Sequence, residues 1–209
     1  MARAKEIAAL RKSDPVLREL IDSLGDYDPD SRLRDRDRPA DAYGALLRAI
    51  VGQQLSTKAA ATIFGRLTDH FGGRTPTPSE LLAADPEEVR AVGLSRPKVG
   101  YIRDLAEHAE SGELELERLE SLSDEDVIAQ LIAVKGLGQW TADMFLIFHL
   151  GRPDVLPVGD LGIRRAAQLA YGLEELPAPE ELRRIADPWR PRRSLACVFL
   201  WRSLRNEPV

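Results

Sequence analysis

Residues 134–142 read Val-Lys-Gly-Leu-Gly-Gln-Trp-Thr-Ala, and this stretch decides the fold. It lies between an amphipathic run over 124–134 and an apolar run over 140–150, so the pattern predicts a helix, a tight hairpin and a second helix. The glycines matter because such a turn needs positive φ and lets another backbone approach without a Cβ clash. The outward amide N–H groups at the start of the second helix favour an anion, and a phosphate fits.

Three side chains of this hairpin would strengthen a phosphate site. Lys135 would add a positive charge, and Gln139 and Thr141 would add hydrogen-bond donors. The glycine pair alone is weak evidence, because a helix that ends at glycine before a new helix has the same pattern.

The rest of the chain also has the periodicity of helices. Helices are predicted over 15–24, 42–54, 56–71, 96–109, 124–134, 140–150, 160–171, 178–185 and 193–204, with further helix starts at 77–80 and 85–88. Residues 26–41 are charged and aperiodic, which predicts a connecting loop, and residues 155–158 are expected to be extended. No strand-like alternation of useful length is present, so the predicted fold class is all-α.

Composition excludes several classes of protein. The chain has 209 residues, 44% of them hydrophobic and 30% charged, which suits one soluble domain or two small lobes. No apolar run is long enough for a membrane span and no signal sequence is evident, so a cytoplasmic, nucleoid-associated protein is expected. The single cysteine, Cys197, excludes an intrachain disulfide and a four-cysteine cluster, and its apolar surroundings predict a core thiol.

The charge distribution leaves nucleic-acid binding open. The formal net charge of −5 argues against a general nucleic-acid binder. Residues 183–205 nevertheless contain seven arginines and one aspartate, while acidic residues crowd 110–126. A local basic face on an acidic molecule is compatible with these numbers.

The lengths of the segments before Asp160 determine where this residue can lie relative to the hairpin. A helix over 139–150 rises about 18 Å, and an extended return over 152–159 spans up to about 26 Å. Asp160 can therefore come back beside Trp140. From the residues alone, an aspartate ahead of an apolar-periodic helix is equally well an N-cap.

Four motifs together resemble a known family. They are the hairpin at 134–142, Ile-Val-Gly-Gln-Gln-Leu-Ser at 50–56, Gly-Leu-Ser-Arg-Pro-Lys-Val at 93–99, and Leu-Pro-Val-Gly-Asp-Leu-Gly at 156–162. The chain resembles, from about residue 41 to 202, the helix-hairpin-helix DNA glycosylase superfamily, and within it the 3-methyladenine DNA glycosylase II (alkylpurine) branch in a compact form. The resemblance implies two helical lobes, 42–152 and 1–41 with 153–209, with DNA and the base in a cleft between them.

The resemblance also implies roles for individual residues. Asp160 matches the essential carboxylate, which stabilises positive charge on the deoxyribose and orients or deprotonates water. Trp140 stands where strand-cutting relatives carry a lysine, so a monofunctional enzyme is expected, with the indole against a cationic base. Gly159 replaces an acidic residue that is common in bacterial relatives, which leaves one carboxylate. Gln54 matches the side chain that fills the gap left by the flipped nucleotide.

The remaining implied contacts are less specific. Tyr43 and Met144 are assigned with Trp140 to the base pocket, although packing accounts equally well for Tyr43. Met144 and Arg192 replace aromatic residues, which predicts a less aromatic pocket. The implied DNA-binding residues are Gln53, Gln54, Ser56, Arg96, Lys98, Lys135, Gly136, Leu137, Gly138, Gln139, Thr141, Arg164 and Arg193. Arg96 and Lys98 are equally well ordinary solvated charges.

The resemblance implies hydrolysis of the N-glycosidic bond of alkylated purines, such as 3-methyladenine and 7-methylguanine, in duplex DNA. The expected partner is DNA with damaged bases, the expected state is a monomer, and no catalytic metal or cofactor is expected. A monovalent cation held by hairpin carbonyls is compatible with the family. The alternatives are a non-catalytic DNA-binding module and a glycosylase for oxidised or deaminated bases.

Overall fold

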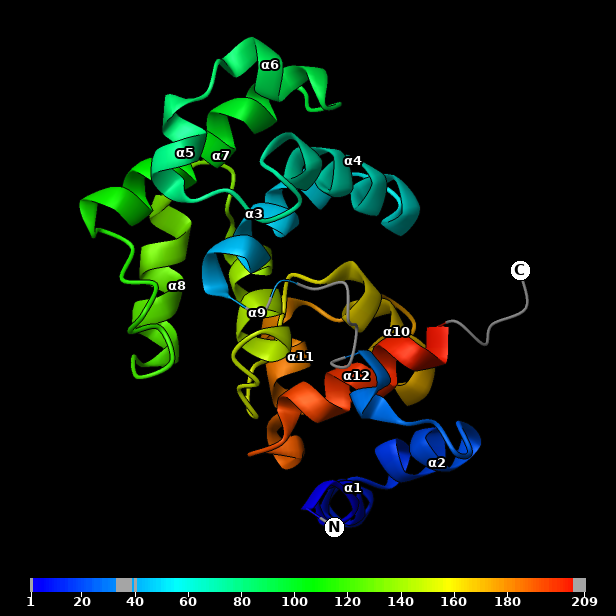
Figure 1. The fold of residues 1–209 in the computed structure, drawn as a ribbon. Helices are drawn as coiled ribbons and strands as arrows, with labels where there is room; N and C mark the ends of the chain where they lie inside the picture. Colours follow the sequence, from blue (N-terminus) through cyan, green and yellow to red (C-terminus); the bar gives the residue numbers. More distant parts are fainter. Residues whose placement is uncertain (1, 33–38, 40, 205–209) are drawn as a thin grey trace. The chain divides into compact units, whose positions relative to one another are not determined.

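The computed structural model describes residues 2–32, 39 and 41–204, and every regular element in them is a helix (Figure 1). Twelve α-helices and two short 3-10 helices form this part of the chain, without a β-strand. The all-α prediction is therefore confirmed for the described residues.

The chain divides into two compact units. Unit 1 takes in 1–35 and 146–209, and unit 2 takes in 36–145, whereas the predicted lobes change at residues 42 and 152. Unit 2 contains α3 (Ala42–Gly52), α4 (Thr57–His70), α5 (Pro78–Ala83), α6 (Pro86–Ala91), α7 (Arg96–Ser111), α8 (Asp124–Ala133) and most of α9 (Gln139–Phe148). Unit 1 contains α1 (Ala2–Ser13), α2 (Pro15–Ser23), η1 (Pro29–Arg32), α10 (Leu161–Tyr171), α11 (Pro179–Ile185), η2 (Asp187–Trp189) and α12 (Arg193–Ser203).

Most helices of unit 2 begin at the polar residues that the sequence indicates. Ser56, Ser95 and Ser123 accept hydrogen bonds from backbone N–H groups in the first turns of α4, α7 and α8. Thr77 and Glu80 form a reciprocal capping box at the start of α5. Helix α7 packs against α3, α5 and α6, so it is the element around which unit 2 is built (Figure 1).

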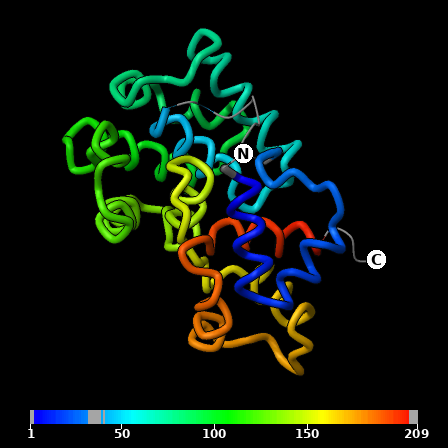
Figure 2. Tube along the Cα trace, turned by 90° about the horizontal axis from the view of Figure 1, so that it is seen from below, coloured from blue at the N-terminus to red at the C-terminus, as the bar shows by residue number. Residues whose placement is uncertain are grey.

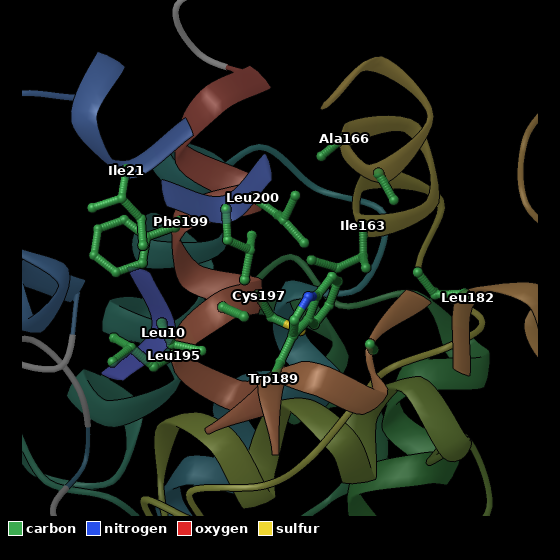
Figure 3. Close-up of a cluster of buried hydrophobic side chains, with 14 residues drawn as sticks. Leu10, Ile21, Ile163, Ala166, Leu182, Trp189, Leu195, Cys197, Phe199 and Leu200 are labelled. Carbon is green, nitrogen blue, oxygen red and sulfur yellow. The ribbon is translucent and has the colours of Figure 1, made fainter. Parts of the chain in front are cut away.

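The core of unit 1 brings the two ends of the chain together. Leu10 of α1 packs in one cluster with Trp189 and Phe199 near the C-terminus (Figure 3), and Leu17 of α2 belongs to the same cluster. Figure 2 shows α1 beside the segment that leads into α12. Cys197 is fully buried in this cluster, which confirms the predicted core thiol. Because α12 is buried from residue 194 to 200, most of its turns face other apolar side chains.

A buried carboxylate lies at the edge of this core. Asp14 caps α2, and its Oδ1 accepts hydrogen bonds from the N–H groups of Val16 and Leu17 at 2.8 and 3.0 Å. Its Oδ2 accepts from the Tyr171 hydroxyl at 2.5 Å and from the Trp189 indole at 3.0 Å. Burial, and then the bond to Asp14, raises the pKa of Tyr171 well above its usual value.

Three further expectations from the sequence concern the loop over 26–41, membrane-spanning helices and metal sites. The predicted loop over 26–41 contains the short helix η1, while its residues 33–38 and 40 lie outside the described part. In the described part of the chain, no helix is both long and apolar enough to cross a membrane. No group of three or more potential metal ligands is found among the same residues.

Candidate functional site

The hairpin has the geometry that its glycines predict. Helix α8 ends at Ala133, the Leu137 N–H donates to the Val134 carbonyl at 3.1 Å, and α9 starts at Gln139. Gly136 has a φ of +84°, and a Cβ built on it would lie 2.4 Å from the Tyr101 ring. Both the backbone conformation and the close approach therefore require glycine at position 136.

The hairpin has both exposed and buried residues. Gly136, Gly138 and Gln139 are exposed, and the Gln139 amide donates to Asp143 Oδ1 at 2.8 Å. The Leu137 side chain is buried, and Thr141 is only 8% exposed. The first turn of α9 therefore leaves little of Thr141 at the surface, and its predicted role as a donor to phosphate stays a prediction.

Lys135 is exposed but paired. Its ammonium lies 2.9 Å from Asp104 Oδ1, and its backbone N–H donates to Asp104 Oδ2 at 2.8 Å. Burial acts to raise the pKa of Asp104, but the bonds and charge of Lys135 outweigh burial and lower it. The pair ties the hairpin to α7, and it leaves a cation at the outer surface.

The loop after α3 carries the predicted wedge residue in an unusual conformation. Gln54 is exposed and has a φ of +57°, a value that residues other than glycine rarely adopt. The preceding Gln53 donates from its amide to the Gly136 carbonyl at 2.6 Å, which links this loop to the hairpin. Ser56 then caps α4. Strained backbone of this kind persists only where the surroundings hold it.

Lys98 is bonded to the end of α3 and is not simply a solvated charge. Its ammonium donates to the carbonyl oxygens of Val51 and Gln53, each at 2.7 Å. Burial lowers the pKa of this ammonium. Arg96, two residues earlier, is exposed, and the predicted phosphate contacts of both residues stay predictions.

The residues assigned to a base pocket have different surroundings. Trp140 lies in the first turn of α9 and is 51% exposed, and Met144, one turn later, is half-buried. Tyr43 is buried within unit 2, and burial followed by the charges of Asp41 and Glu110 raises its pKa well above the usual value. The burial of Tyr43 favours the packing alternative.

Asp160 is held in a defined orientation at the start of α10. Its Oδ1 accepts hydrogen bonds from the Ile163 N–H at 2.7 Å and from the Trp201 indole at 2.9 Å, and the residue is 8% exposed. The Trp201 ring packs against Phe148 with centroids 5.7 Å apart. A Cβ at Gly162 would lie 3.0 Å from Asp160 Oδ1 and 3.3 Å from Trp201, so glycine keeps this corner open.

Trp201 belongs to this site, but the sequence does not predict it there. Trp201 closes the apolar run of α12 and looks like core packing, because nothing in the sequence shows that its indole faces the loop before α10. The only available signal is that a tryptophan N–H near a buried surface needs an acceptor.

Two arginines predicted to bind DNA are engaged elsewhere. Arg193 Nε lies 2.8 Å from Asp154 Oδ1, its Nη2 donates to the Asp154 carbonyl at 2.6 Å, and its side chain is only 17% exposed. Arg164 Nε donates to the Pro177 carbonyl at 2.9 Å. The guanidinium groups hold loops of unit 1 at the starts of α12 and α11, and the predicted DNA contacts of both arginines stay predictions.

The prediction that Asp160 approaches Trp140 stays a prediction. Asp160 belongs to unit 1, whereas Trp140, Gln54 and the hairpin belong to unit 2. The geometry above defines each group within its own unit.

The predicted monovalent cation at the hairpin stays a prediction. The Val134 carbonyl accepts from Leu137 N–H and the Gly136 carbonyl accepts from Gln53. Each carbonyl oxygen has a second lone pair, so these bonds do not decide whether a cation binds there.

Comparison with known proteins places these features in a family context. A family model described as "HhH-GPD superfamily base excision DNA repair protein" matches residues 47–191. DNA-3-methyladenine glycosylase 1 of Schizosaccharomyces pombe is 35% identical over 192 residues, which cover 91% of this chain and 82% of that protein. A crystal structure of DNA-3-methyladenine glycosidase from Bacillus halodurans has a TM-score of 0.80 at 36% identity and covers 96% of this chain and 89% of its own. A 3-methyladenine DNA glycosylase of S. pombe in complex with abasic DNA has a TM-score of 0.80 at 34% identity and covers 95% of each chain.

Proposed function

Because this chain belongs to the HhH-GPD superfamily of base excision DNA repair proteins, we propose that it is a DNA glycosylase of the 3-methyladenine type that hydrolyses the N-glycosidic bond of alkylated purines in duplex DNA. The observation that carries the proposal is the carboxylate of Asp160, which the Trp201 indole and the Ile163 N–H fix at the start of α10. Pure binding to a polyanion gains nothing from such a carboxylate.

Asp160 supplies the charge that the reaction needs. As the bond between C1′ and the base nitrogen breaks, positive charge develops on the deoxyribose, and an oriented carboxylate stabilises it. The same group orients or deprotonates the water that attacks C1′. Two hydrogen bonds to Oδ1 hold the carboxylate in place before the substrate arrives, which limits reorganisation during the reaction.

Trp140 accounts for two features of the proposed reaction. These are the preference for a cationic base and the absence of strand cutting. An exposed indole attracts an alkylated purine, because the methylated ring carries positive charge. This cationic base is a good leaving group and needs no general acid. Trp140 also offers no amine for a Schiff base, so the enzyme leaves an intact strand with an abasic site.

Unit 2 grips and opens the DNA. The exposed hairpin amides, Lys135 and the exposed Arg96 face a phosphate backbone, and Gln54 enters the gap that the flipped nucleotide leaves. Extrusion costs a few kcal/mol, and the inserted side chain offsets part of this cost. The expected partner is damaged duplex DNA bound by a monomer in the cytoplasm, where the nucleoid lies.

The proposal is tested with methylated duplex DNA. The protein is incubated with the duplex, released bases are identified by chromatography, and strand integrity is followed on a denaturing gel. We expect release of 3-methyladenine and 7-methylguanine without strand scission. Binding without release would indicate a DNA-binding module, and scission without added base would contradict the monofunctional reaction. Release of bases from a matched duplex with oxidised or deaminated bases, but not from the methylated duplex, would overturn the substrate class.

A further inference from the structure

One face of α7 holds both DNA-directed segments of unit 2. Lys98, Tyr101 and Asp104 are spaced by three residues, which places them on the same side of a helix. Lys98 binds the end of α3, Tyr101 packs under Gly136, and Asp104 binds Lys135. Helix α7 therefore contacts two segments at successive turns. One is the loop after α3 that carries Gln54, here called the wedge loop (residues 53–56), and the other is the hairpin.

The hydrogen bonds made by Lys98 lie next to Gln54, the residue with positive φ. Its ammonium binds the carbonyls of Val51 and Gln53, and the second of these belongs to the peptide bond that leads into Gln54. The Gln53 N–H itself donates to the Ile50 carbonyl. The backbone on the N-terminal side of Gln54 is thus fixed from both directions, which accounts for the φ of +57° at an exposed residue.

The Gln53 side chain connects the wedge loop directly to the hairpin. Its amide reaches the Gly136 carbonyl at 2.6 Å, so the wedge loop touches the hairpin directly. Gly136 lies on Tyr101 of α7, and the neighbouring Lys135 is bound twice by Asp104. Neither segment can shift along α7 without breaking a contact made by the other.

We propose that Lys98 is a positioning residue that sets the distance between the Gln54 wedge and the phosphate-binding hairpin, and that it contacts no DNA. This inference rests on the proposed function, since it assigns a purpose to the wedge. Lys98 needs the compact ammonium of lysine, because one nitrogen atom must serve two carbonyls on the same stretch of backbone.

The proposal separates two kinds of binding. A duplex with an abasic site accepts the wedge, whereas an undamaged duplex tests mainly the phosphate contacts. Replacing Lys98 with methionine keeps the length of the side chain and removes its donors. We expect Lys98→Met to weaken binding to abasic duplex about tenfold. We expect binding to undamaged duplex to change less than about twofold, with the same slope of affinity against salt.

Arg96→Met is the matched comparison, because Arg96 lies two residues away in the same turn of α7 and is exposed. A phosphate ligand lost at this position weakens binding to both duplexes equally and reduces the salt slope by about one. If Lys98→Met shows this uniform pattern instead, Lys98 is a phosphate contact and the proposal is overturned.

A double-mutant cycle tests whether Lys98 acts through the wedge. In a Gln54→Ala background, Lys98→Met should cost less than about twofold on abasic duplex, because the side chain to be positioned is gone. An undiminished tenfold loss in that background would overturn the proposal. Gln53→Leu provides a second variant, and it should show the same selective loss if Lys98→Met fails to fold. These readouts use binding alone, so they are distinct from a failure of base release by the wild type.

Discussion

Two aspartates of unit 1 use the same local chemistry in different surroundings. Asp14 and Asp160 each cap a helix, are nearly buried, and accept a hydrogen bond from a tryptophan indole. Asp14 has donors on both carboxylate oxygens, all from within the core of unit 1. Asp160 has its capping N–H and its indole donor on the same oxygen, Oδ1, in the loop that resembles a catalytic loop.

The comparison shows that an N-cap and a catalytic carboxylate are not alternatives. The capping bond and the indole give each side chain one orientation, which stabilises the fold at Asp14 and serves the proposed reaction at Asp160. The two aspartates should differ in the effect of removing the negative charge. At Asp160 the rate of base release should fall, and at Asp14 the free energy of unfolding should fall.

The largest expected effect is on the rate of base release. Asp160→Asn keeps an oxygen that can accept the Ile163 and Trp201 bonds but removes the negative charge. We expect the single-turnover rate to fall by about 10²–10⁴, while the free energy of unfolding changes by less than about 1 kcal/mol. Quench-flow or manual sampling of methylated duplex, together with urea unfolding, measures both quantities.

Asp14→Asn is the control for this prediction, and its pattern should be reversed. Its amide would set N–H groups against the donors of Tyr171 and Trp189, so the free energy of unfolding should fall by about 2–4 kcal/mol. The rate per folded molecule should be unchanged. Equal rate losses in the two variants would remove the distinction between the aspartates.

Replacing the tryptophans that donate to these two aspartates should give the same contrast between rate and stability, with smaller changes. Trp201→Phe keeps an aromatic ring beside Phe148 and removes the donor to Asp160, so base release should slow about ten- to thirtyfold. Trp189→Phe removes the donor to Asp14 and should lower the free energy of unfolding by about 1–3 kcal/mol without slowing release. A Trp201→Phe enzyme with the rate of the wild type would show that the indole does not orient the carboxylate.

The smallest expected effect is an alkaline one at the Asp14 site. Because the pKa of Tyr171 is raised in the folded state, its stabilising contribution is present below the unfolded value of about 10 and is lost as pH rises above it. Tyr171→Phe should cost about 1 kcal/mol at neutral pH and should lose less stability than the wild type above pH 10. Thermal unfolding from about pH 8 to 11 measures the difference; parallel curves would contradict it.

Much of the fold follows from local signals in the sequence. Asp14 and Asp160 cap helices that begin where the pattern predicts, because capping depends on the first turn of a helix alone. The hairpin at 134–142 is predictable for the same reason, since two glycines and the flanking periodicity are all local.

The sequence does not predict side-chain bonds whose partners are far away along the chain. Lys98 binds carbonyls 45 and 47 residues earlier, and Arg193 binds Asp154, 39 residues earlier. The Thr141 side chain is buried in the first turn of α9. A basic residue in a DNA-binding sequence motif gives no sign of such a partner, because the partner lies in another element.

In the proposed reaction, Asp160 is presented to C1′ of a nucleotide that unit 2 has extruded. The most direct measurement is a crystal structure of the protein with duplex DNA that carries an alkylpurine analogue on a 2′-fluoro sugar, which resists hydrolysis. We predict a carboxylate oxygen of Asp160 within about 3.5 Å of C1′, with the base against Trp140 and Gln54 in the stack. A bound, extruded nucleotide with Asp160 remote from its sugar would contradict the account.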